Sequence, residues 1–140
     1  MGRMACVALA AVILLSSVIF GQKYLHDVLT DIAESADRVC VFLAENKGLE
    51  GEAALQALLH DFERHKKVLL LFLNDVRVHE LHRSVTRSLR LVEVRDFSPA
   101  LEAMSDFAAS LRELADTHHP TAENVLKVMN LSQFHLDKPP

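Results

Sequence analysis

The chain has 140 residues, with 15 Lys and Arg against 19 Asp and Glu, which gives a formal net charge of −4. This length has room for one small domain with one core. The acidic balance argues against nucleic-acid binding, which needs a basic surface. Only four glycines and four prolines are present, and Ala, Leu, Glu and Arg are abundant. We therefore expect an all-α fold.

The first predicted element is an uncharged apolar run from Met4 to Gly21. A helix over this run is about 27 Å long, close to the thickness of a bilayer's hydrocarbon core. Arg3 precedes the run, as in a signal peptide, but small residues are missing at the cleavage positions: a cut after Gly21 places Ile19 at −3. The sequence therefore predicts a retained membrane anchor, and a secreted domain after signal cleavage is the alternative.

We expect three segments along the chain: the anchor over 1–22, a helical bundle domain over 23–132 and a flexible tail over 133–140. Positive charge precedes the anchor and acidic residues soon outnumber Lys23 after it. The positive-inside rule then predicts a single-pass protein of the cell membrane, with the amino terminus cytoplasmic and the domain extracytoplasmic.

Apolar residues at spacings of three and four predict amphipathic helices after the anchor. The first continues the anchor without a break, and its inner row is Leu25, Leu29, Ile32, Ala36, Val39 and Leu43. A turn is expected over Asn46–Gly51, which carries two glycines. The second helix, from about Glu52, has the inner row Leu55, Leu58, Phe62, Leu69, Phe72 and Val76. Its last part, 68–73, is apolar nearly all round.

Asn74 and Asp75 are suited to cap a third helix, although the sequence leaves open whether the second and third helices are separate. The inner row of the third helix is Val78, Leu81, Val85, Leu89 and Val92. Ser98 as N-cap and Pro99 at the first position predict the start of a fourth helix. Its inner row is Leu101, Met104, Ala108, Leu111 and Ala115. This helix is expected to stop at His118–Pro120, and a short last helix is expected from Thr121.

A shift of 46 residues aligns several apolar positions, including Ile32 with Val78 and Leu58 with Met104. This weak internal repeat predicts two related helix hairpins that bury their apolar faces against each other in an antiparallel bundle. Two unrelated amphipathic hairpins would also align this well, so both interpretations stay open.

A set of positions in the second half of the chain carries a family resemblance: Phe62, Lys66, Lys67, Leu71, Phe72, Val78, Leu81, Ser84, Val85, Glu123, Asn124, Val125 and Leu126. The stretch that contains them resembles the body of a domain-of-unknown-function family of small, N-terminally membrane-anchored helical proteins of spore-forming Firmicutes. Phe62 stands where the family often has Trp, and Asp75 where a His is expected. The resemblance implies an anchor and a helical fold, and it implies no activity.

Few residues suggest chemistry. His65 lies on the inner side of the second helix, and His79 and His82 lie one turn apart on the third, so a metal site is an alternative hypothesis. A repeated Glu-x-x-His pair or a HExxH motif is missing. Cys40 lies beside the inner row of the first helix and is expected to be a small core residue. We expect neither an enzyme nor a bound cofactor.

Two charged stripes carry the functional hypothesis. Asp27, Asp31 and Glu34 line one face of the first helix, and a basic stripe lines the third: Arg83, Arg87 and Arg90. The stripes could pair with each other or remain solvated, or the arginines could bind an acidic surface of another membrane protein or anionic lipid headgroups. We expect an accessory or scaffold protein that contacts another membrane protein through the arginines. A ligand-sensing or metal-binding extracytoplasmic bundle is the alternative.

Overall fold

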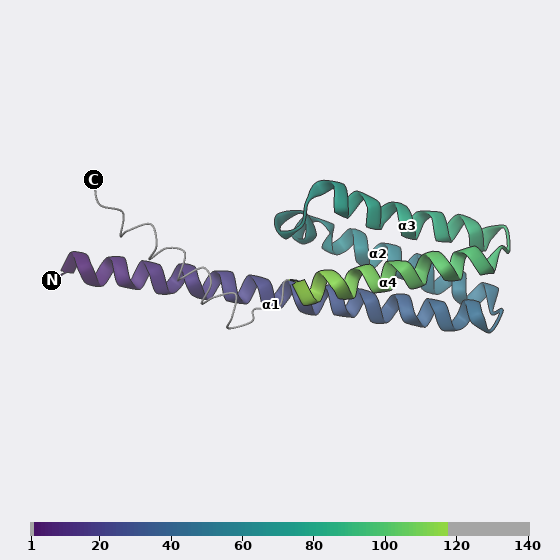
Figure 1. Cartoon of the computed structure of the whole chain (residues 1–140), viewed down its shortest axis with the longest axis horizontal. Helices are drawn as coiled ribbons and strands as arrows, with labels where there is room; N and C mark the ends of the chain where they lie inside the picture. Colours follow the sequence, from purple (N-terminus) through teal and green to yellow (C-terminus); the bar gives the residue numbers. More distant parts are fainter. Residues whose placement is uncertain (1, 118–140) are drawn as a thin grey trace, which may run out of the picture.

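The computed structural model describes residues 2–117. Over this range the chain is all-α, as expected, and consists of α1 (Gly2–Ala44), α2 (Gly48–Phe72), α3 (Asp75–Glu93) and α4 (Phe97–Thr117). Figure 1 shows the second half of α1 packed with the other three helices, while its first half projects from the bundle. The predicted last helix from Thr121 and the tail over 133–140 lie outside the described residues.

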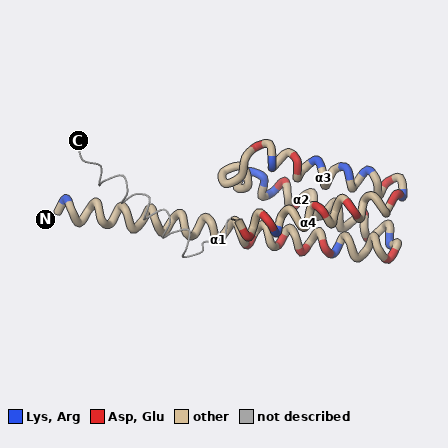
Figure 2. Tube along the Cα trace, in the orientation of Figure 1, with Lys and Arg blue, Asp and Glu red and all other residues tan. Residues whose placement is uncertain are grey.

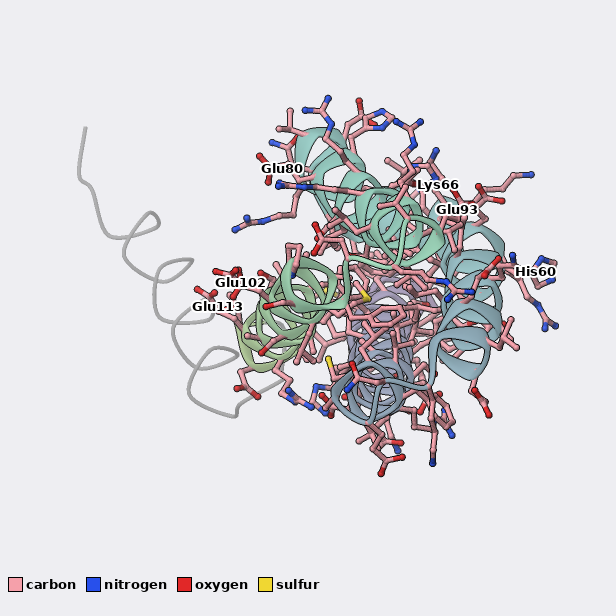
Figure 3. The ribbon with its side chains drawn as sticks, turned by 90° about the vertical axis from the view of Figure 1, so that its right-hand side faces the viewer. His60, Lys66, Glu80, Glu93, Glu102 and Glu113 are labelled. Atoms are coloured by element: carbon pink, nitrogen blue, oxygen red, sulfur yellow. The ribbon has the colours of Figure 1, made fainter. Side chains whose placement is uncertain are left out.

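The four helices form a closed ring around one core. Each packs against its neighbours in the chain, and α4 returns to pack along α1. Short connections reverse the chain direction each time, so adjacent helices are antiparallel (Figure 1). α1 and α3 therefore occupy opposite corners. Seen end-on, the labelled His60, Glu102 and Glu113 point away from the bundle, and apolar side chains fill its centre (Figure 3).

α1 is a single helix with two different environments. Every residue from 3 to 20 is exposed, whereas the inner row predicted for its second half, from Leu25 to Leu43, is buried throughout. The exposed part is long and apolar enough to cross a bilayer by length and composition. The prediction that the apolar run continues into the first bundle helix without a break is confirmed.

The other inner rows are confirmed in most positions. Leu89 and Leu101 are only partly buried, and both pack against the core from its edge. Two positions of the second row are wrong, because Phe72 and Val76 are exposed and Leu73 is buried instead. The reason is that α2 ends at Phe72, and Leu73 is extended with a ψ of 154°. The helical period on which the prediction relied stops there.

α2 and α3 are separate helices, and Asn74 caps α3 as predicted, since its side chain accepts a hydrogen bond of 3.0 Å from the backbone N–H of Val76. Two other boundaries differ from the prediction. α2 begins at Gly48, so Gly51 lies inside the helix, buried against Leu43. α4 begins at Phe97, so Pro99 stands in its first turn, where the missing N–H leaves no helical bond unmade.

The α1–α2 and α3–α4 turns have the same geometry. Asn46 and Arg95 are the non-glycine residues of positive φ in the described chain, at 56° and 59°. Each donates its N–H to the carbonyl three residues back, and the next residue donates to the carbonyl five back, as in a Schellman-type C-cap. Arg95 follows Asn46 by 49 residues (95 minus 46). The structure therefore relates the two hairpins by a shift of 49, and the shift of 46 is wrong by about one helical turn.

α2 offers a matched test of the core. Leu55 is fully buried, whereas Leu49, on the same helix, is exposed. We expect Leu55→Ala to lower the free energy of unfolding by about 2–5 kcal/mol, because it removes buried methyl groups and leaves a cavity. Leu49→Ala should change it by less than about 0.5 kcal/mol. Chemical denaturation of both variants in mild detergent, followed by circular dichroism, measures the difference. Equal effects would show that the inner row of α2 is misassigned.

Candidate functional site

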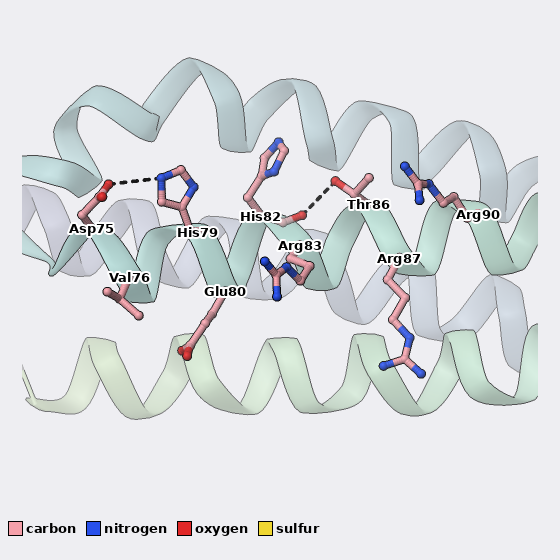
Figure 4. Close-up of a pocket in the computed structure, with 9 residues that line it drawn as sticks. All are labelled: Asp75, Val76, His79, Glu80, His82, Arg83, Thr86, Arg87 and Arg90. Atoms are coloured by element: carbon pink, nitrogen blue, oxygen red, sulfur yellow. Dashed lines mark hydrogen bonds and ion pairs between the residues drawn. The ribbon is translucent and has the colours of Figure 1, made fainter.

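The three arginines of the predicted docking face lie on the outer side of α3. Arg83, Arg87 and Arg90 are all exposed, and together they line an open, shallow groove on this helix. Figure 4 shows Arg83 facing outward, Arg87 extending toward α4 and Arg90 on the opposite edge of α3. We call these three residues the arginine face. At spacings of four and three residues, the directions of neighbouring arginines around the helix axis differ by at most about one-sixth of a turn.

Within residues 2–117, none of the three arginines forms an ion pair or side-chain hydrogen bond. Like charges at these spacings disfavour a helix by about 0.2–0.5 kcal/mol per pair. Figure 2 shows Lys and Arg along α3, in contrast to the Asp and Glu along α1 and α4. The arginine face is therefore a local concentration of positive charge on an acidic chain.

The hypothesis that the two charged stripes pair with each other is wrong for the described residues. Asp27, Asp31 and Glu34 are exposed on α1, which occupies the corner opposite α3. No ion pair in the described chain joins the two stripes. The ion pair that α1 makes with a neighbouring helix involves Asp37, outside the stripe, and Arg112 of α4.

The structure does not bring the three candidate metal ligands together. His65 donates from Nδ1 to the carbonyl of Asp61 on its own helix, at 2.9 Å, and borders a small hollow between α1 and α2. His79 lies 3.4 Å from Asp75, and His82 lies 3.4 Å from Glu63. Among the described residues, no group of three or more His, Cys, Asp or Glu is arranged to hold a metal ion. The positions of His65, His79 and His82 therefore do not support the metal-binding hypothesis.

His82 is instead a packed residue that joins two helices. Its ring centroid lies 6.1 Å from that of the fully buried Phe62, and its Nε2 approaches the Glu63 carboxylate of α2. The ring therefore covers one side of the core while its polar edge faces solvent. This is the usual role of a histidine on an otherwise apolar face.

Cys40 packs against the core as a partly buried residue, which confirms its predicted role. Burial raises the pKa of its thiol, and the nearby negative charge of Asp37 raises it further. The guanidinium of Arg112 acts in the opposite direction but does not cancel the rise. The folded protein therefore keeps this thiol protonated, and unreactive, to a higher pH than a free cysteine.

The raised pKa of Cys40 predicts slow alkylation. In a Cys6→Ser background, the rate with iodoacetamide should rise with pH through a midpoint above about 8.5, the value of an unperturbed thiol. The stability that the protonated thiol contributes is present below that pH and is lost as pH rises through the higher folded value. The matched control is Val41→Cys with Cys40→Ala, since Val41 is exposed next to it. Equal rates at the two positions at pH 8 would contradict the prediction.

A second surface feature lies at the end of the bundle from which α1 projects. The last turn of α2 and the first of α3 expose four apolar side chains: Leu70, Leu71, Phe72 and Val76. Sequence reasoning singled out the apolar segment 68–73 but placed Phe72 and Val76 in the core. The available signal was the segment 68–73, which is apolar nearly all round and directly follows Lys66 and Lys67.

Comparison with known proteins found no matching family model, no matching curated protein and no matching solved structure. The resemblance to the Firmicutes family stays a prediction.

Proposed function

We propose that the protein is a single-pass membrane-anchored accessory or scaffold, whose helical bundle lies on the extracytoplasmic side and binds an acidic surface of another membrane protein through the arginine face. The observation that carries this proposal is the division of α1. Its first half is apolar and exposed, and its second half supplies eight buried residues of the bundle.

The exposed half of α1 supports the anchor. A contiguous apolar surface this long on a soluble monomer would be an aggregation site, whereas in a bilayer it is matched to its surroundings. Ser16 and Ser17 donate their hydroxyls to the carbonyls of Val12 and Ile13, so the polar side chains inside the span are satisfied within the helix. Arg3 directly before the span favours a cytoplasmic amino terminus.

The direction of α3 favours a protein partner over lipid headgroups. α3 starts at the end of the bundle from which α1 projects and runs away from it (Figure 1). Arg90 follows Asp75 by 15 residues, about 22 Å along the helix. On the proposed topology the face stands roughly upright beside the membrane, beyond the reach of headgroups at its far end. Arginine's planar, bidentate guanidinium suits the carboxylates of an acidic protein surface.

The anchor is tested by fractionation. Expressed in a bacterium, the protein should remain in the membrane fraction after alkaline and high-salt washes, with its original amino terminus. Protease added to the extracytoplasmic side should cleave the chain after the anchor, because the bundle lies on that side. Mass spectrometry of the intact chain and protease protection measure both. A mature chain that begins near Gln22 would overturn the proposed anchor.

Such a cleaved product would support the alternative of a secreted bundle. One observation supports folding of such a cleaved bundle: every buried apolar residue in the described chain lies at Leu25 or later. Cleavage near Gln22 would therefore leave the core whole. The same mass measurement of the intact chain distinguishes the membrane-anchored scaffold from the secreted bundle.

The partner interaction is tested by charge reversal. The triple variant Arg83→Glu, Arg87→Glu and Arg90→Glu should keep its helicity and its membrane insertion, because these side chains are exposed and unpaired among the described residues. Recovery of crosslinked partners in mild detergent should fall. High salt should have the same effect on the wild type, since the screening length shrinks from about 10 Å at 0.1 M to about 3 Å at 1 M.

The matched control reverses three other exposed basic residues, Arg38, Lys47 and Arg64, on different faces of the bundle. It makes the same change of net charge and should leave partner recovery intact. Equal loss in both triple variants would show that only net charge matters. Unchanged recovery in the arginine-face variant, at low and high salt, would rule out this face.

A further inference from the structure

The connection between α2 and α3 exposes several large apolar side chains to solvent. Leu71 is 80% exposed and Val76 is 62% exposed, while Leu70 and Phe72 are each 39% exposed. Leu70, Leu71 and Phe72 are consecutive, and Val76 follows after the buried Leu73 and the exposed Asn74 and Asp75. We call the four exposed apolar residues the apolar tip.

The apolar tip lies beside the point where α1 leaves the bundle (Figure 1). Phe72 fixes this position, because its ring rests on the backbone of Gly21: a Cβ at residue 21 would lie 3.0 Å from the ring Cζ. Gly21 is the last residue of the apolar run that is proposed to span the membrane. The tip therefore lies at the depth at which the anchor emerges from the hydrocarbon core.

We propose that the apolar tip is a second membrane contact, which inserts into the interface between headgroups and acyl chains beside the anchor. This inference rests on the proposed anchor and goes beyond it, since it assigns the bundle itself a lipid-binding surface. The occupant is the bilayer because the tip is continuous with the exposed apolar surface of α1. Interfacial burial of apolar side chains at this depth is favourable.

The residues just above the tip are those that favour a membrane interface. Tyr24 is exposed on α1, one turn beyond Gly21, and Lys23 precedes it. On α2, Lys67 stands one turn before Leu71, about 6 Å farther from the membrane. Tyrosine is enriched at headgroup level, and lysine extends its ammonium group toward lipid phosphates while its methylene groups remain in apolar surroundings.

The opposite end of the bundle supplies the contrast. Leu49 is 83% exposed at the start of α2 and Val94 is 72% exposed after α3, so each matches a tip residue in type and exposure. Neither has an exposed apolar neighbour in the sequence: Gly48 and Glu50 flank Leu49, and Glu93 and Arg95 flank Val94. The tip differs because three exposed apolar residues, Leu70 to Phe72, follow one another in the chain.

The chain contains no tryptophan, so one introduced tryptophan reports on one position. The full-length protein is reconstituted into vesicles of phosphatidylethanolamine and phosphatidylglycerol with brominated acyl chains, which quench tryptophan in the membrane. Leu71→Trp and Val76→Trp report on the tip, Leu49→Trp and Val94→Trp are their matched controls, and Val12→Trp reports on the anchor. Circular dichroism checks that each variant is folded.

We expect bromine quenching of Leu71→Trp and Val76→Trp together with a loss of quenching by aqueous acrylamide, and the reverse for both controls. If the tip reporters behave like their controls while Val12→Trp is quenched by bromine, the tip inference is overturned and the anchor stands. If Val12→Trp is not quenched by bromine, the proposed anchor and the inference both fall. Bromine quenching at all four bundle positions would also overturn the inference, because the bundle would then lie flat on the membrane.

Discussion

The structure depends on one uninterrupted helix that meets two different environments. Residues 3–20 of α1 are apolar and exposed, and from Leu25 the same helix supplies one corner of a four-helix core. A glycine inside a helix costs about 0.5–1 kcal/mol relative to alanine. Gly21 nevertheless stands at the junction, where any larger residue would displace the ring of Phe72. The continuous helix and this contact together fix the direction in which the bundle extends from the exposed apolar half of α1.

The two hairpins of the bundle are nearly equivalent. With the shift of 49 residues, the buried positions Leu29, Ile32, Ala36 and Leu43 correspond to the buried Val78, Leu81, Val85 and Val92. Val39 corresponds to Ser88, the one buried polar residue of the described core, whose hydroxyl donates to the carbonyl of Ser84. A shift of 46 also aligned apolar residues, because three residues are almost one helical turn. Only the turns at Asn46 and Arg95, with their matching hydrogen bonds, determine the register.

Periodicity was sufficient to predict the helices and most of the core, since each inner row repeats every three or four residues and each helix has one buried stripe. It failed at Phe72 and Val76, because a segment that is apolar on all sides has no preferred face and the helix ends within it. The arginine face could be found from spacing alone. Spacing could not show that the arginine face has no ion-pair partner on the acidic stripe. This follows from the ring order of the helices, which places α1 and α3 at opposite corners. Spacing likewise could not show that His65, His79 and His82 lie apart, because this depends on which helix faces each ring.

The same ring order makes the bundle electrically asymmetric. The acidic stripe of α1 and the arginine face of α3 lie on opposite sides, so the separation of charge runs across the bundle and, on the proposed topology, parallel to the membrane. On the proposed function, a partner anchored in the same bilayer would approach along that direction. Confinement of both proteins to one membrane would raise the partner's effective concentration, which strengthens a contact between exposed charges that is weak between soluble proteins. On this proposal, the three arginines of α3, which have no ion-pair partner within residues 2–117, would select the partner by charge.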